Sequence, residues 1–473
     1  MMNAKIVHLI FIYTFLAYDV FRAIGSGVVF RRQFQQKFPP VDRLSRGDPG
    51  VPLFLTPYIQ KGDIDHARHL ATVGPLIGTE VLSYSGFLTV NEMSNGNLFF
   101  WFFPSQSGGT HDPVLLWLQG GPGDSSLSGA LNENGPFGVD EDLRLFRRKF
   151  SWTTKYNMLY VDNPVGAGFS FADDYDGYAR TEDQVAENLL EALLQFFTLF
   201  PDLKAADFYL TGYSYAGKYI PALMSRIRRD LPRPKVNLKG LAIGSGFSDP
   251  PGMVQAYADF MYQTGLLDKL QRDRVANQTR EIVNLVNRNK WVEAEATWRN
   301  ALAYFENCSG SVDITNYLRC KLPVGMGYYA QWLSFADVRR SIHVGNLTYN
   351  DNSKVHRFLL ADIMKSVKPQ LAEAMNNYRV MLYSGQLDVV VAVPLTETML
   401  RTVDWKYRAE YLSTPRQVWR VRPDDVEVAG YVRRVRDLYQ VVVRGGGHIL
   451  PWDQPERAWD MIDRFISGRP FHQ

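Results

Sequence analysis

The chain has 473 residues, of which 46% are hydrophobic, so it can bury a large core in two units or in one domain with an insertion. Its 52 basic and 49 acidic residues are mixed along the chain and leave a net charge of only +3. This balance excludes the strongly basic surface typical of nucleic-acid-binding proteins, so no nucleic-acid partner is predicted.

The N-terminal 25 residues have the pattern of a secretory signal. A lysine lies near the start, an apolar run extends from Ile6 to Tyr18, and small residues follow at Ala23 to Gly25. The run is shorter than the roughly 20 residues that span a bilayer, so residues 1–25 are predicted to be a cleaved signal peptide. A membrane anchor is the alternative, since aromatic residues continue to Phe21. Cleavage would leave a secreted or lysosomal protein without a membrane segment.

The first elements predicted after this signal are a hairpin and a buried strand. Tyr84 to Phe103 forms two alternating apolar runs, with Asn95-Gly96 as a two-residue turn between them. The strand Val114–Leu118 leads into the glycine-rich loop Gln119–Gly123. Such a loop lets backbone N–H groups approach a reacting oxygen, although a plain tight turn is the simpler interpretation.

The segment 207–219 combines a strand, a sharp turn and a helix around Ser214. Phe208–Leu210 is strand-like, Gly212 opens the turn, and residues 215–229 are compatible with a helix. This order is typical of the nucleophile elbow, in which the turn lifts a serine hydroxyl out of the fold. The small residues form Gly-x-Ser-x-Ala, a loose match that an ordinary Gly-Tyr-Ser turn also satisfies.

Strands and helices alternate along the chain on both sides of this elbow. The pattern predicts a mostly parallel sheet with helices on both faces, an α/β architecture. At Asp249–Gly252 the sequence changes to polar helices, and strand character returns only at Tyr378. We therefore expect a helical cap inserted into the sheet, which divides the chain into core residues 26–250, cap residues 251–360 and core residues 361–473. Asp453 is expected in the acidic cap of a closing helix that runs to Ser467.

Features of an exposed surface gather in the expected cap. Three N-glycosylation motifs begin at Asn277, Asn307 and Asn346. Cys308 and Cys320, the two cysteines of the chain, also lie there. In an oxidising compartment they are expected to form a disulfide that closes a short loop.

A serine hydroxyl becomes a nucleophile only when a base takes its proton and a third group orients that base. Of the four histidines after Ser214, only His448 directly follows a strand-like run, in a glycine-rich turn. Asp388 lies in the turn beyond another strand-like run, residues 378–383. The order Ser214, Asp388, His448 is typical of catalytic triads in α/β-hydrolases. A solvated loop position is the alternative for the aspartate and for the histidine.

Longer motifs carry a resemblance to a known family, over a stretch from near Tyr84 to near Ser467. They are residues 85–90, 117–123, 133–136, 163–170, the elbow, 385–388 and 447–451. The chain resembles the serine carboxypeptidases, most closely the vitellogenic-carboxypeptidase-like branch. The resemblance implies an α/β-hydrolase fold with a helical cap, the triad named above, and an oxyanion hole formed by the N–H groups of Gly121 and Tyr215. Compared with the family, this chain has few cysteines, and Asp124 stands where many members carry a cysteine.

The resemblance further implies a site for the substrate's free carboxylate, built in the family from an asparagine and two glutamates. Here Gln119 replaces the asparagine, Glu133 matches one glutamate, and Tyr213 replaces the other. A phenol stays protonated at any working pH. It would donate a hydrogen bond either to the substrate carboxylate or to Glu133, and in the second case it would keep Glu133 ionised. We therefore expect weakened or altered carboxypeptidase activity with an intact serine nucleophile. The alternative is that Tyr213 is accommodated without effect.

The predicted function is that of a serine-type carboxypeptidase acting on the C-termini of peptides or proteins. A serine esterase or acyltransferase of the same fold is one alternative. A catalytically silent, secreted binding or storage protein is another. No cofactor or metal is predicted, because His66 and His69 lack a further ligand set. The sequence predicts neither the oligomeric state nor the natural substrate.

Overall fold

The structure is a computed structural model and describes residues 47–74, 80–109, 111–230 and 236–471. The predicted signal peptide lies outside these residues. Within them, no helix combines the length and the apolar character that a membrane crossing requires.

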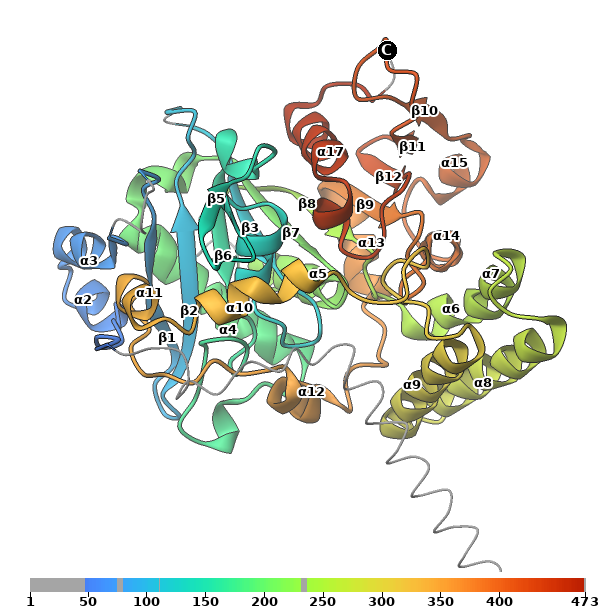
Figure 1. Cartoon of the computed structure of the whole chain (residues 1–473), viewed down its shortest axis with the longest axis horizontal. Helices are drawn as coiled ribbons and strands as arrows, with labels where there is room; N and C mark the ends of the chain where they lie inside the picture. Colours follow the sequence, from blue (N-terminus) through green and yellow to red (C-terminus); the bar gives the residue numbers. More distant parts are fainter. Residues whose placement is uncertain (1–46, 75–79, 110, 231–235, 472–473) are drawn as a thin grey trace, which may run out of the picture.

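A ten-stranded mixed sheet forms the centre of the described chain (Figure 1). Its six central strands run parallel, and antiparallel strands extend both edges. This confirms the predicted α/β class. In spatial order the strands are β1 (Tyr84–Asn91), β2 (Gly96–Phe103), β6 (Asn157–Val161), β3 (Val114–Leu118), β7 (Phe208–Tyr213), β8 (Leu238–Gly244), β9 (Arg379–Gly385), β12 (Leu438–Val443), β11 (Gly430–Val435) and β10 (Gln417–Trp419). A separate hairpin pairs β4 (Phe137–Val139) with β5 (Leu145–Arg147).

The hairpin β1–β2 forms as predicted, but its turn is different. Gly96 already belongs to β2 and pairs with Asn91, so the connection is residues 92–95 rather than Asn95-Gly96. The side chain of Asn91 accepts hydrogen bonds from the N–H groups of Met93 and Ser94. The loop therefore adopts an Asx turn at Asn91 in place of the predicted two-residue turn at Asn95-Gly96.

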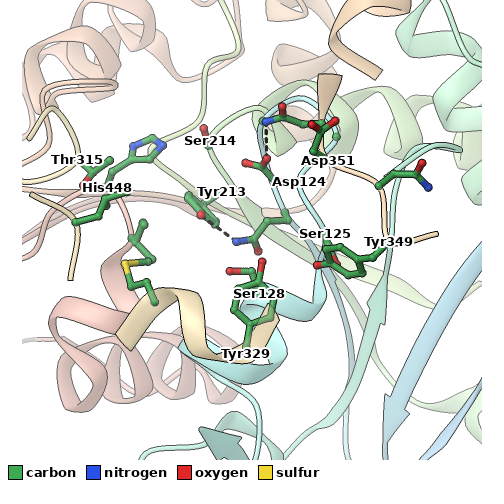
Figure 2. A pocket seen from close by; sticks show the side chains of 18 residues that line it. Asp124, Ser125, Ser128, Tyr213, Ser214, Thr315, Tyr329, Tyr349, Asp351 and His448 are labelled. Carbon is green, nitrogen blue, oxygen red and sulfur yellow. Dashed lines mark hydrogen bonds between the residues drawn. The ribbon is translucent and has the colours of Figure 1, made fainter. Parts of the chain in front are cut away.

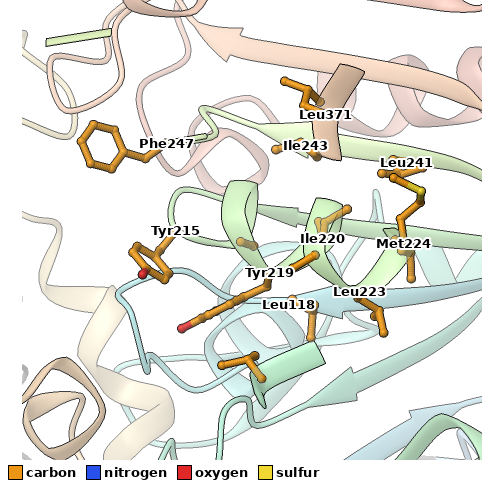
Figure 3. Close-up of a cluster of buried hydrophobic side chains, with 14 of the residues drawn as sticks. Leu118, Tyr215, Tyr219, Ile220, Leu223, Met224, Leu241, Ile243, Phe247 and Leu371 are labelled. Atoms are coloured by element: carbon orange, nitrogen blue, oxygen red, sulfur yellow. The ribbon is translucent and has the colours of Figure 1, made fainter. Parts of the chain in front are cut away.

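The strands divide their side chains between two core layers because successive residues of a strand point to opposite faces. In β3, Leu116 and Leu118 belong to one layer, and Leu115 and Trp117 belong to the other. The first layer packs under α4 (Glu182–Leu199), α5 (Ala216–Arg229), α13 (Lys368–Asn377) and α14 (Val393–Leu400). Figure 3 shows part of it, where apolar side chains of α5 meet those of β3 and β8.

The second layer is covered by shorter elements and by the last helix of the described chain. They are η2 (Gly129–Glu133), α10 (Tyr328–Trp332), α11 (Ala336–Ser341), α16 (Leu450–Asp453) and α17 (Pro455–Ser467). The small helices α2 (Thr56–Gln60), α3 (Ile64–Ala71) and α15 (Arg408–Ser413) pack at the periphery. Helices thus cover both faces of the sheet, as the alternating pattern predicted.

Between β8 and β9 the chain forms helices. The longest are α8 (Lys269–Asn287) and α9 (Trp291–Cys308), which Figure 1 shows as a helical hairpin beside the sheet. Asp268 and Gln271 form a reciprocal capping box that fixes the start of α8. The shorter α-helices here are α6 (Pro250–Met253), α7 (Tyr257–Gln263), α10, α11, α12 (Ser353–Leu359) and α13.

The expected disulfide is not formed, because Cys308 and Cys320 are both free. Cys308 is the last residue of α9 and packs, half-buried, against the first core layer. Cys320 is exposed in the loop that follows. The disulfide was predicted because the two cysteines are close in the sequence. A disulfide also requires that their side chains face each other at short distance.

Candidate active site

The turn between β7 and α5 holds Ser214 in the left-handed region, with φ of +59°. This is a strained conformation for a residue other than glycine. Three backbone hydrogen bonds maintain it. The N–H of Ser214 donates to the carbonyl of Gly244 at 2.9 Å, and the Ser214 carbonyl accepts from the N–H groups of Gly217 and Phe247. The structure therefore has the geometry of a nucleophile elbow.

Two glycines explain why small residues surround the elbow. A Cβ atom on Gly212 would collide with the carbonyl of Leu118 on β3 and lie 2.9 Å from the Cβ of Ala216. A Cβ atom on Gly120 would lie 2.5 Å from the Cβ of Ser214. The last position of the Gly-x-Ser-x-Ala pattern is Ala216. The elbow accommodates this alanine, so a glycine at that position is not required.

Asp388 and His448 meet although 60 residues of sequence separate them. Nδ1 of His448 lies 2.8 Å from Oδ2 of Asp388, and both side chains are buried. The other carboxylate oxygen of Asp388 accepts from the N–H of Val391 at 3.0 Å. A carboxylate held in this way fixes the ring orientation of the histidine and leaves Nε2 for a reacting group.

Ser214 and His448 line the same small pocket (Figure 2), which also contains Gln119, Asp124 and Tyr213. The ring of Tyr213 packs edge-on against that of His448, with the centroids 5.4 Å apart. Among the described residues, no hydrogen bond joins Oγ of Ser214 to His448. Such bonds are commonly long in substrate-free enzymes and shorten in the complex.

The N–H groups of Gly121 and Tyr215 are free to bind a ligand. Neither donates to another group within the described chain. The Tyr215 nitrogen lies 2.9 Å from an ideal Cβ on Gly120, so the glycine-rich loop and the start of α5 are adjacent. Two free N–H groups beside a serine hydroxyl can stabilise the negative charge that develops on an attacked carbonyl oxygen.

The segment 313–319, between the two cysteines, holds both loops of the pair Asp388–His448. The carbonyl of Thr315 accepts from the N–H of His448 at 2.6 Å, and the carbonyl of Ile314 accepts from the N–H of Val389 at 3.0 Å. Tyr317 closes the contact by donating its N–H to the Leu387 carbonyl at 3.1 Å. Sequence patterns gave no signal for this role, because it depends on contacts between distant parts of the chain.

Asp453 belongs to the same arrangement, and its predicted role as a helix cap is wrong. It ends α16, and Gln454 occupies the N-cap position of α17. Oδ2 of Asp453 accepts from the N–H of Gly447 at 2.8 Å, and Oδ1 accepts from Arg319 at 2.9 Å. The carboxylate therefore ties the His448 loop to the segment 313–319.

The three residues predicted to bind a carboxylate are joined by hydrogen bonds, but only Gln119 and Tyr213 line the small pocket, and Glu133 is buried behind Gln119. The indole N–H of Trp117 donates to Oε1 of Gln119 at 2.8 Å, and because an indole can only donate, it fixes the orientation of the amide. Nε2 of Gln119 then donates to Oε1 of Glu133 at 2.9 Å and to Oη of Tyr213 at 3.0 Å. Since the amide uses both of its hydrogens, the phenol proton of Tyr213 is directed elsewhere. No direct bond between Tyr213 and Glu133 is formed among the described residues.

Burial changes the protonation of two carboxyl groups at this site. Burial raises the pKa of Glu133 to about 7, although the hydrogen bond from Gln119 acts against the shift. Burial likewise raises the pKa of Asp124 to about 6, against a 2.7 Å hydrogen bond from Asn352. Both groups are therefore largely neutral in mildly acidic solution and charged above neutral pH. Asp124 and Asn352 are site residues that sequence reasoning did not place.

The fold and this constellation define an α/β-hydrolase with a serine, histidine and aspartate brought to one site. A family model described as serine carboxypeptidase matches residues 75–468. The probable serine carboxypeptidase CPVL of Homo sapiens is 49% identical over 446 residues, which cover 92% of this chain and 94% of that protein. The venom serine carboxypeptidase of Apis mellifera is 42% identical and covers 94% of this chain and 97% of its own length.

A solved structure supports the same fold. It is that of Kex1(delta)p, a prohormone-processing carboxypeptidase from Saccharomyces cerevisiae, with a TM-score of 0.75 and 22% sequence identity. The superposition covers 85% of this chain and 96% of the yeast chain. The chain belongs to the serine carboxypeptidase family, and it is a serine-type carboxypeptidase, a hydrolase. The family predicted from the sequence motifs is thus confirmed.

Proposed function

We propose that Ser214 attacks the last peptide carbonyl of a substrate and that His448 accepts the hydroxyl proton. The histidine then returns this proton to the departing amino group, and water hydrolyses the resulting acyl-enzyme. Asp388, 2.8 Å from Nδ1 of His448, orients the ring and stabilises its cation. The N–H groups of Gly121 and Tyr215 would stabilise the tetrahedral intermediate. The short bond between the buried aspartate and the histidine, beside a strained serine, is the observation that carries this proposal.

Tyr213 gives this chain a distinct means of recognising the free carboxylate. Its hydroxyl accepts from Gln119 and keeps its own proton, which is available to a substrate carboxylate in the small pocket. Burial also raises the pKa of Tyr213 well above its ordinary value, so the proton is retained. This favours the first of the two expected roles, donation to the substrate. A single neutral phenol replaces a glutamate of the family's pair, so recognition is weakened but retained.

Peptides with a free C-terminus and their C-terminal amides test this function. Purified protein should hydrolyse the free acid, and Ser214→Ala should abolish both turnover and labelling by a fluorophosphonate probe. Tyr213→Phe should raise KM for the free acid about tenfold, the cost of one hydrogen bond to a charged group, while its effect on the amide stays small. An unlabelled wild type would indicate a silent binding protein, and equal turnover of acid and amide would refute carboxylate recognition.

The helices between β8 and β9 fit the role of a cap. Residues of α9 and α12 line one wall of a cavity. Gly121, Ser214 and Tyr215 of the core line it as well. Such an arrangement restricts entry and favours substrates that present a chain end. The boundaries 251 and 360 remain a prediction. Limited proteolysis that cut within residues 26–250 or 361–473 before it cut at the edges of this segment would contradict the assignment.

We assign the protein to the secretory pathway, either secreted or lysosomal. The predicted leader supports this, as do the exposed glycosylation acceptors Asn277, Asn307 and Asn346. The relative from Apis mellifera is described as a venom enzyme. Mass spectrometry of protein recovered from a eukaryotic host tests the assignment, and an intact N-terminus with unmodified asparagines would contradict it.

A further inference from the structure

A second, larger cavity also borders Ser214, and most of its lining residues differ from those of the small pocket. The small pocket has a volume of about 110 Å³ and is lined by Gln119 and Tyr213 of the proposed carboxylate site. The large cavity has a volume of about 500 Å³ and shares Gly121, Ser214 and Asn352 with the small pocket. A substrate whose C-terminal residue occupies the small pocket therefore places its acyl portion, the rest of the peptide, in the large cavity.

Cationic side chains dominate the wall that α9 and α12 contribute to this cavity. Arg299, Lys354 and Arg357 line it, and Glu295 is its one carboxylate among the described residues. With histidine counted as neutral, the lining carries three positive charges and one negative charge. The floor is apolar, since Phe247 and Trp298 stack there with ring centroids 5.0 Å apart.

The one carboxylate of the cavity is already engaged. Glu295 is fully buried, and its Oε1 lies 2.7 Å from Nε of Arg299 and 3.0 Å from Nε2 of His356. Lys354 and Arg357 have no carboxylate within 4 Å in the described chain, and Lys354 contacts only the amide oxygen of Asn350, at 3.4 Å. Two exposed cations therefore remain to pair with a ligand.

The lining of the small pocket contains carboxyl groups but no lysine or arginine side chain among the described residues. The carboxyl groups are those of Asp124 and Asp351. The linings of the two cavities thus differ in charge. A negative side chain on the acyl portion is favoured beside the cations of the large cavity, whereas the C-terminal carboxylate is proposed to bind in the small pocket through a hydrogen bond from neutral Tyr213.

We propose that the large cavity selects an acidic side chain, glutamate in particular, on the residue whose carbonyl Ser214 attacks. The side-chain carboxylate pairs with Arg357 and Lys354 of α12, and the methylene groups contact the apolar floor. This inference rests on the proposed function, because it requires the C-terminal residue to occupy the small pocket.

Blocked dipeptides with glutamate, glutamine or lysine before a C-terminal phenylalanine test the inference. At low salt, kcat/KM for the glutamate peptide should exceed that for the glutamine peptide about fivefold, the range of two partly exposed ion pairs. The lysine peptide should be the slowest of the three. The preference for glutamate should decline at high salt, because exposed charges are screened.

Charge reversal in the cavity provides the matched comparison. Arg357→Glu should bring the glutamate-to-glutamine ratio below one and accelerate the lysine peptide relative to glutamine. Arg180→Glu is the control: Arg180 lies over the ring of Phe358 on α12 at 5.5 Å but does not line the cavity. The control should leave the ratio at its wild-type value.

The outcomes separate the two proposals. If the glutamine peptide is hydrolysed as fast as the glutamate peptide, the proposed function stands and the inference is overturned. The same conclusion follows if Arg180→Glu changes the ratio as much as Arg357→Glu. If none of the peptides is hydrolysed, the proposed function fails and the inference fails with it.

Discussion

At the residue scale, the amide of Gln119 determines what its neighbours can do. Trp117 fixes its oxygen, so both amide hydrogens go to Glu133 and Tyr213. Neither neighbour donates to the other, and the phenol proton remains for the substrate. The Gln119 and Tyr213 substitutions are visible in the sequence, but the direction of these hydrogen bonds depends on Trp117, which sequence motifs did not connect to the site.

The second oxygen of Glu133 explains why the carboxyl stays neutral in acid. Oε2 is buried and has no hydrogen-bond partner among the described residues. Ionisation would leave this oxygen without solvation, and burial accordingly raises the pKa of Glu133 to about 7. Above that pH, a negative charge appears beside the site proposed for the substrate carboxylate.

This predicts that KM for a free-acid peptide rises about tenfold between pH 6 and pH 8 in the wild type, through like-charge repulsion. Glu133→Gln keeps the position neutral, so the rise should shrink. Steady-state kinetics across this range measure the effect. Asp124 also ionises near pH 6, so Asp124→Asn is measured in parallel and should lower the rise further. A Glu133→Gln profile that coincides with the wild-type profile would contradict the account.

At the scale of elements, the segment 313–319 and Asp453 align two catalytic loops that follow the neighbouring parallel strands β9 and β12. Asp453 has a side chain that is only 6% exposed, and Arg319, its partner at 2.9 Å, is 24% exposed. Asp453→Asn would weaken that ion pair and the bond to Gly447. Because a shift of about 1 Å in a reacting group can cost up to 10²-fold in rate, kcat should fall at least tenfold while KM changes little.

Asp463→Asn is the matched control for this prediction. Asp463 is equally buried and pairs with Lys155 at 2.8 Å and Arg469 at 2.6 Å, but it lies on α17 and does not contact the His448 loop. Both variants should lower the thermal midpoint, since each removes a charge from a buried ion pair. Only Asp453→Asn should lower kcat. A normal kcat in that variant would show that Asp453 has no positioning role.

The elements that sequence patterns predicted well are those whose cause is local. The strand, turn and helix around Ser214 have that character, and so do the glycine-rich turns after β9 and β12 that carry Asp388 and His448. The wrong predictions concern positions where a second local interaction is preferred, or where the partner lies far away in the sequence. Asn91 overrides the expected turn at Asn95-Gly96, and Asp453 binds Gly447 and Arg319 instead of capping a helix. Contacts of this kind become visible only when the whole chain is folded.

At the scale of the whole molecule, burial raises the pKa of several carboxyl groups. The pKa is raised to about 6 or 7 in five of them, with burial as the largest cause in each. They are Asp124, Glu133, Asp162, Glu182 and Glu306. A protein with neutral buried carboxyl groups is suited to an acidic compartment, which agrees with the lysosomal alternative of the proposed location.

The sign of the resulting pH dependence follows from linkage. A carboxyl group with a raised folded-state pKa binds more protons in the native state than in the unfolded state between about pH 4.5 and pH 7. Its contribution to the free energy of unfolding is therefore full below that window and is lost as the pH rises through the folded-state pKa. His343 and Lys218 oppose this trend, because burial lowers the pKa of each. Five carboxyl groups act against these two bases, so stability should fall with rising pH.

We predict that the thermal midpoint is higher at pH 5 than at pH 8 by about 5 °C or more, after allowance for the size of the chain. Differential scanning calorimetry at one scan rate and fixed ionic strength measures it. Glu133→Gln removes one of the five titrating groups, so its midpoint should differ less between the two pH values than that of the wild type. A wild-type midpoint that is unchanged or higher at pH 8 would mean that these carboxyl groups are solvated or paired in solution, and the prediction of a neutral Glu133 at the active site would fail with it.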